Sequence, residues 1–115
     1  MYKFINLDYM EMMTEGDDEM KQTMLEMLLA ELPEELQKLH DYHAAGDWRN
    51  VNEVSHKMKS SLAFVGSDEF SDTNKEIEKI AKYGDGYERV PALLVRLEAV
   101  YQQVMPELQS ELEKI

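Results

Sequence analysis

The stretch from residue 51 to residue 66 reads VNEVSHKMKSSLAFVG, and its spacing predicts an amphipathic helix. Each residue turns an α-helix by about 100°, which places a set of apolar side chains on one face. These are Val51, Val54, Met58, Leu62 and Val65. His56 points almost straight away from that stripe, among polar, charged or small residues: Asn52, Glu53, Lys59, Ser60, Ala63 and Ser67. The helix therefore combines a core face with an opposite platform that carries an imidazole, a group able to act as nucleophile or proton carrier near neutral pH.

The sequence before this helix has the same helical periodicity, without the β-branched runs and turn dipeptides of hairpins. A short helix is expected over residues 6–13, followed by a break at Gly16 and a cap at Asp17 or Asp18. The next helix is expected to turn a methionine-rich stripe inward and to be interrupted or restarted at Pro33. Its predicted inner residues are Met20, Met24, Met27, Leu28, Leu32, Leu36, Leu39 and Tyr42.

Glycines and short polar residues separate the remaining helices. Gly46 and Asp47 predict a stop and a cap before Trp48, and Ser67 with its acidic neighbours caps a further helix. The inner face of that helix is expected to carry Phe70, Ile77, Ile80 and Ala81. Residues 84–86 form a loop, and the last helix has Pro91 in its first turn and a kink or break at Pro106. Short connections between long amphipathic helices predict one all-α domain over residues 1–115, an antiparallel up-and-down four-helix bundle with a short N-terminal helical extension.

The composition narrows the classes of function. The net charge is −12, from 24 acidic and 12 basic residues, which argues against binding to nucleic acid or to an anionic membrane surface. The chain has no cysteine, and its sequence contains neither a secretory signal nor a membrane span. We therefore expect a cytoplasmic protein, and its charge favours a monomer. The lysines are concentrated near His56 and on the following helix: Lys57, Lys59, Lys75, Lys79 and Lys82.

Residues 56–66, HKMKSSLAFVG, resemble the signature of histidine-containing phosphotransfer (HPt) domains. The matching positions are His56, the apolar Met58, Lys59, Ser61 and Gly66. The resemblance extends over nearly the whole chain, including the order of the helices and the positions of the loops. One departure is Ser60, which stands where the family usually has glycine.

The resemblance implies a carrier in a two-component phosphorelay rather than an enzyme with its own nucleotide site. His56 would accept a phosphoryl group from an aspartyl phosphate of one receiver domain and pass it to an aspartate of another. Lys59 would neutralise phosphoryl charge, and Glu78 would orient the imidazole. Ser60 and Ala63 would leave room for the partner, while Lys82 and Lys79 would extend the basic surface. The partners implied are response-regulator receiver domains or a hybrid histidine kinase, with the divalent metal on the receiver and no cofactor on this chain.

Several alternatives remain open from the sequence. Because Ser60 departs from the usual glycine, a second interpretation stays open: an HPt-like interaction module that binds a receiver or other signalling partner without carrying phosphate. Glu78 and Lys82 could instead form an i, i+4 pair, and Lys57 is interpreted as solvated charge. His40 and His43 could share a metal, but cations near a helix C-terminus explain them better. The apolar N-terminal residues either pack over one end of the bundle or leave an exposed patch for docking. A sequence that begins at Met1 favours a free-standing protein over a part of a hybrid kinase.

Overall fold

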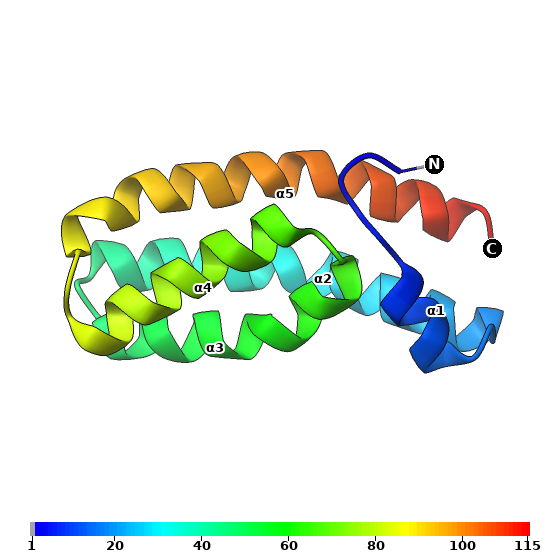
Figure 1. Cartoon of the computed structure of the whole chain (residues 1–115), viewed down its shortest axis with the longest axis horizontal. Coiled ribbons are helices and arrows are strands. Elements are labelled where there is room, and N and C mark those ends of the chain that lie inside the picture. Colours follow the sequence, from blue (N-terminus) through cyan, green and yellow to red (C-terminus); the bar gives the residue numbers. More distant parts are fainter. Residues whose placement is uncertain (1) are drawn as a thin grey trace.

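The computed structural model describes residues 2–115 and is helical along most of that length (Figure 1). Met1 lies outside the described residues. The helices are α1 (Asp8–Thr14), α2 (Asp18–Ala44), α3 (Trp48–Val65), α4 (Asp68–Tyr83) and α5 (Val90–Glu113), with a 3-10 turn, η1 (Tyr87–Arg89), before α5. No strand occurs in residues 2–115, so the all-α prediction is confirmed.

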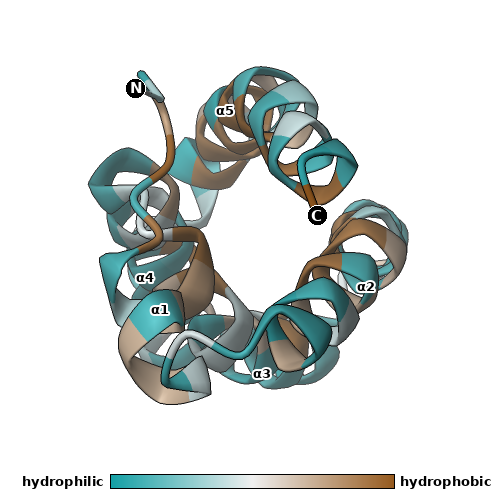
Figure 2. Cartoon of the chain, turned by 90° about the vertical axis from the view of Figure 1, so that its right-hand side faces the viewer, coloured by the Kyte–Doolittle hydropathy of each residue, from teal (hydrophilic) through white to brown (hydrophobic). Residues whose placement is uncertain are grey.

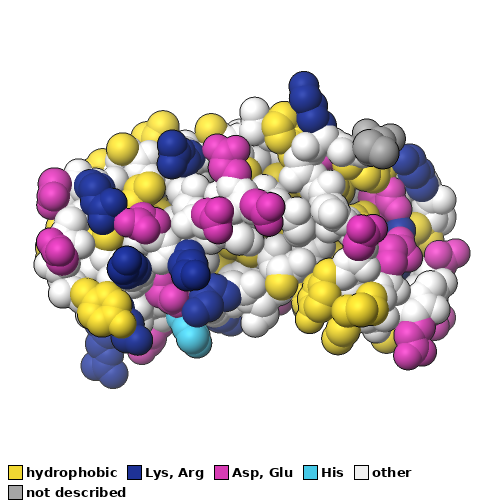
Figure 3. Space-filling view, in the orientation of Figure 1, with side chains coloured by type: hydrophobic (Ala, Val, Ile, Leu, Met, Phe, Trp, Pro, Cys, Tyr) yellow, Lys and Arg dark blue, Asp and Glu magenta, His cyan; other side chains and the backbone are white. Residues whose placement is uncertain are grey.

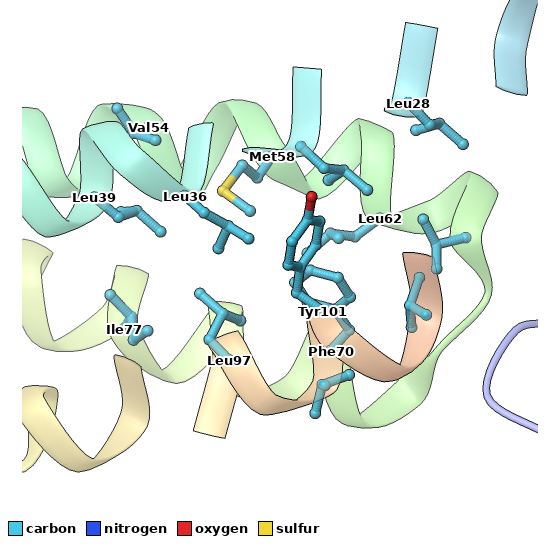
Figure 4. Packing of buried hydrophobic residues seen from close by; sticks show 14 of the residues in the cluster. Leu28, Leu36, Leu39, Val54, Met58, Leu62, Phe70, Ile77, Leu97 and Tyr101 are labelled. Atoms are coloured by element: carbon cyan, nitrogen blue, oxygen red, sulfur yellow. The ribbon is translucent and has the colours of Figure 1, made fainter. Parts of the chain in front are cut away.

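Four long helices surround one core. Each of α2, α3, α4 and α5 packs against two of the others, in the cyclic order α2–α3–α4–α5, and α1 packs against α2 and α3. Seen end-on, the four ribbons form a ring with hydrophobic residues toward its inside (Figure 2). Side chains from all four helices fill this space, among them Leu36, Met58, Phe70 and Tyr101 (Figure 4).

Side-chain caps fix where three of these helices begin, as predicted. The carboxylate of Asp17 accepts hydrogen bonds from the backbone N–H groups of Glu19 and Met20, so Asp17 rather than Asp18 is the cap of α2. Asp47 caps α3 and Ser67 caps α4 in the same way. A cap satisfies N–H groups that have no partner within the helix, and it thereby fixes the boundary.

The prediction for the inner face of α2 was wrong at two of its methionines. Met20 and Met27 are 51% and 42% exposed, while Leu25, Leu28 and Leu32 are buried. Both sets have helical spacing, but they lie on different faces of the helix. The leucine face points to the core, and the methionine face lies toward the surface with only Met24 partly buried.

The predicted interruption at Pro33 and the predicted break at Pro106 were also wrong, while a kink at Pro106 stays a prediction. Pro33 lies inside the continuous helix α2, and Pro106 lies inside α5. An internal proline removes one backbone hydrogen bond and disfavours the helix by about 3 kcal/mol. Buried residues on both sides of each proline, such as Leu32 and Leu36 around Pro33, hold the two halves against the same core.

The N-terminal segment crosses the end of the molecule between α5 and α1 (Figure 1). The carboxylate of Glu107 accepts hydrogen bonds from the backbone N–H groups of residues 3, 4 and 5 at 2.8–3.1 Å. The N–H of Asn6 donates to the carbonyl oxygen of Val65 at 3.0 Å, which joins the segment to the end of α3. These bonds bury Ile5 and bring the segment directly over Gly66.

An ion cluster beneath this segment ties α2 to α5. The buried Lys21 lies 2.5 Å from carboxylate oxygens of both Glu11 and Glu111. Burial alone would lower the pKa of Lys21, but its hydrogen bonds to the two carboxylates outweigh that effect and raise it. Hydrogen bonds from Lys21 and from the Tyr2 hydroxyl lower the pKa of Glu111.

Candidate functional site

The orientation of α3 is as the sequence predicts. All five residues of its apolar stripe, from Val51 to Val65, are buried. His56 lies on the opposite side, and 71% of its side chain is exposed. The packing of α3 against the core therefore presents the imidazole to solvent.

Glu78 of α4 joins the imidazole to a lysine. Nδ1 of His56 lies 3.0 Å from Oε2 of Glu78, and Nζ of Lys59 lies 3.1 Å from Oε1 of the same carboxylate. Since an ionised carboxylate only accepts, Nδ1 is the donor, and in the neutral ring the lone pair is on Nε2. Only 14% of the Glu78 side chain is exposed, in contrast to His56. The structure thus brings together His56, Lys59 and Glu78, in an arrangement that leaves Nε2 as the nucleophilic nitrogen.

The other predicted site residues lie on the same two helices as this group. Ser60 and Ala63 are exposed on α3, and helical spacing puts their small side chains on the side of His56. Lys79 and Lys82 are exposed on α4. Lys82 lies 5.4 Å from the centre of the Tyr83 ring, and Glu78 pairs with His56 and Lys59 in place of the alternative i, i+4 pair. On the face of the molecule in Figure 3, a histidine lies at the lower edge with basic and acidic side chains beside it.

The remaining charged candidates have local partners. Nζ of Lys57, interpreted from the sequence as solvated, lies 3.7 Å from the buried carboxylate of Glu35. His40 lies 3.7 Å from Glu98, and His43 packs edge-on against Trp48. In the described part of the chain, no three His, Cys, Asp or Glu side chains are grouped as a metal site requires.

The two interpretations of the apolar N-terminal residues each hold in part. Met10 is fully buried over the end of the core. Met12 and Met13 are 64% and 49% exposed, and the exposed ring of Tyr9 packs on Phe64 of α3 at 5.2 Å between centroids. An apolar surface therefore continues from α1 onto the helix that carries His56.

Two asparagines at the contact between α3 and α4 were missed as functional candidates. Nδ2 of Asn74 donates to the carbonyl oxygen of Ser55 at 2.9 Å, and Nδ2 of Asn52 donates to the carbonyl oxygen of Glu78 at 3.2 Å. The signal for Asn74 was its position between Phe70 and Ile77, on a face where only Thr73 is also polar. A polar residue at such a position is informative because burying an amide is unfavourable without a partner.

None of the helices in residues 2–115 combines the length and apolarity that a membrane crossing requires. A search of curated proteins found no match. Among solved structures, the fold is similar to histidine-containing phosphotransfer protein B (HptB) from Pseudomonas aeruginosa PAO1. The TM-score is 0.88 at 21% sequence identity, over 97% of this chain and 96% of that chain. A family model described as "Hpt domain" matches residues 23–115, the region that contains α3 and α4 with His56, Lys59 and Glu78. The chain therefore belongs to the Hpt domain family.

Proposed function

We propose that this protein is a phosphocarrier of a two-component phosphorelay and that His56 is its phosphoacceptor. The observation that carries the proposal is the exposed imidazole of His56, whose Nδ1 is held by Glu78 and whose neighbour is Lys59. This arrangement occurs in a chain of the Hpt domain family. It supplies a nucleophilic nitrogen, a fixed ring and a cation within one surface.

The transfer step needs little more from this chain. The lone pair on Nε2 of His56 attacks the phosphorus of an aspartyl phosphate, a bond forms between nitrogen and phosphorus, and the bond from phosphorus to the aspartyl oxygen breaks. The aspartate leaves as a carboxylate, and the positive charge that develops on the imidazole is stabilised through Nδ1–H by Glu78. Lys59 faces phosphoryl oxygens as a point charge. The reverse step returns the phosphoryl group to a second aspartate.

The surroundings of His56 support a protein as the donor. Ser60 and Ala63 are exposed and small, which leaves room for the loops of a receiver domain, and Lys79 and Lys82 add positive charge for its acidic pocket. The divalent metal of the reaction belongs on the receiver, so this chain needs no cofactor, nucleotide site or independent turnover. We further propose that α2–α5 are the antiparallel up-and-down four-helix bundle of the family, with α1 as its extension, and that the protein is a cytoplasmic monomer.

Transfer from a phosphorylated receiver domain tests this proposal. Wild type, His56→Gln and the control His40→Gln are each incubated with a labelled phospho-receiver, and acid-labile, base-stable phosphate on the product is measured. The control removes another solvent-accessible histidine, on α2, and leaves the candidate site intact. We expect label on wild type and His40→Gln and none on His56→Gln. Receiver binding without label on any variant would favour the alternative, an interaction module that does not carry phosphate.

A further inference from the structure

Two asparagines connect α3 to α4 beside the candidate site, and their hydrogen bonds run in opposite directions. We infer that Asn52 and Asn74 are positioning residues that hold the carboxylate of Glu78 against His56. The inference rests on the proposed role of His56, which it deepens by assigning residues outside the reacting group.

Asn74 reaches from α4 to the backbone of α3 immediately before the phosphoacceptor. Its side-chain N–H group donates to the carbonyl oxygen of Ser55 at 2.9 Å, and both residues are fully buried. Ser55 is small, and its own hydroxyl donates to the carbonyl oxygen of Val51 within the helix. The bond from Asn74 therefore fixes α4 relative to the peptide group that joins Ser55 to His56.

Asn52 makes the reciprocal connection from α3, one turn before His56. Its side-chain N–H group donates to the backbone carbonyl oxygen of Glu78 at 3.2 Å. The residue whose carboxylate binds His56 is thus held at its backbone by the helix that carries His56. With one bond at Ser55 and one at Glu78, both the rotation and the axial position of α4 against α3 are constrained.

The energetics of Asn74 suit a positioning role better than a stabilising one. Its Oδ1 atom is buried and has no hydrogen-bond partner among the described residues. A buried amide oxygen without a partner disfavours the folded state, whereas an apolar side chain of suitable size would pack at this position without that cost. The net gain from the single bond to Ser55 is small, because that bond replaces hydrogen bonds to water in the unfolded chain.

A small displacement is enough to separate the carboxylate from the imidazole. The distance from Nδ1 of His56 to Oε2 of Glu78 is 3.0 Å. Successive residues of an α-helix are offset by about 1.5 Å along the axis and 100° around it, so a shift of α4 against α3 by one residue carries the Glu78 carboxylate away from Nδ1. Without the carboxylate at Nδ1, the neutral ring is free to carry its proton on either nitrogen, and the form with the proton on Nε2 is not a nucleophile at that atom.

The test uses the whole chain with the substitution Asn74→Leu and, because a core change could prevent folding, the partly exposed Asn52→Ala as a second variant. The first readout is the tautomer of His56, measured by nitrogen-15 NMR at a pH where the ring is neutral. The second is the rate of phosphorylation by phosphoramidate and by a phospho-receiver. We expect each variant to fold, to lose the preference for the proton on Nδ1, and to be phosphorylated about tenfold more slowly.

A double-mutant cycle with Glu78→Gln separates positioning from a general structural effect. If Asn74 acts through the carboxylate, Asn74→Leu adds little to the loss that Glu78→Gln already causes. The control is Asn50→Ala, which removes an amide bonded to Asp47 at the start of α3 and leaves the α3–α4 contact intact. Two results would overturn the inference. One is a wild-type tautomer ratio of His56 in both Asn74→Leu and Asn52→Ala; the other is that Asn74→Leu slows phosphorylation as much in the Glu78→Gln background as in wild type. If wild type itself accepts no phosphate, the proposed function fails, while the tautomer measurement still decides whether the asparagines position Glu78.

Discussion

Gly66, the glycine that ends α3, provides a sharp prediction because the chain contains a matched control for it. Its φ is +72°, and a Cβ atom there would overlap the carbonyl oxygen of Asn6. Gly46, between α2 and α3, has nearly the same φ, +69°, but no atom lies within 4 Å of the place that its Cβ would occupy. The substitutions Gly66→Ala and Gly46→Ala therefore share one source of strain and differ in the other.

The shared strain is that of an L-residue in the left-handed region, about 1–2 kcal/mol in each variant. Gly66→Ala must in addition displace the segment that contains Asn6. This displacement breaks the bond from Asn6 N–H to Val65, worth about 1 kcal/mol, and uncovers part of Ile5, whose full burial is worth about 1.5–3 kcal/mol. We therefore expect Gly66→Ala to be the less stable variant by about 1–3 kcal/mol.

Urea denaturation of the two variants beside wild type measures this difference. Hydrogen exchange at the backbone of residues 3–6 should rise in Gly66→Ala and stay at the wild-type level in Gly46→Ala, because only the first change moves the N-terminal segment. Equal free energies of unfolding, or unchanged exchange in Gly66→Ala, would refute the reasoning. They would mean that the segment is not held over Gly66 in solution.

Three further predictions concern other single groups. The backbone N–H groups of residues 3–5 donate to the Glu107 carboxylate, so Glu107→Ala should speed their hydrogen exchange. Glu107→Gln keeps an acceptor oxygen and should preserve part of the protection. Because the folded pKa of Glu111 is lowered, its contribution to stability is present above its unfolded pKa of about 4.3 and is lost as the pH falls through the folded value. Glu111→Gln should therefore flatten the acid limb of stability against pH, and an unchanged limb would contradict the assignment. Lys59→Ala should slow phosphotransfer to His56 about tenfold or more while leaving receiver binding detectable by titration.

The inner face of α3 was predictable from the sequence, whereas that of α2 was not. On α3 a single apolar stripe stands opposite a polar face, so only one orientation buries it. On α2 the methionines and the leucines form two apolar stripes with the same period, and periodicity alone does not rank them. The packed neighbours decide the orientation: Leu25 and Leu28 face the core, and Met20 and Met27 remain at the surface.

The continuity of α2 through Pro33 has a similar explanation. Local propensity favours a break there, and the sequence gives no measure of how firmly the flanking turns are held. In the folded chain Leu28, Leu32 and Leu36 are buried against other helices, and this tertiary packing outweighs the loss of one backbone hydrogen bond. The same argument applies to Pro106 between Val104 and Leu108.

In the candidate site, the residues that contact one another, His56, Lys59 and Glu78, were predictable from the sequence. Those that align α3 with α4, Asn52 and Asn74, were not. The resemblance assigned Lys59 and Glu78 to His56, and the structure places Nδ1 of His56 and Nζ of Lys59 within 3.1 Å of the Glu78 carboxylate. Asn74 lies on the buried face of α4, where the sequence shows it, with Thr73, only as a polar residue among apolar ones. Its significance depends on which backbone carbonyl it meets, and that depends on the rotation of α4 about its own axis. A residue whose role is to fix that rotation is recognisable only when the rotation is known, which is why Asn74 required the structure.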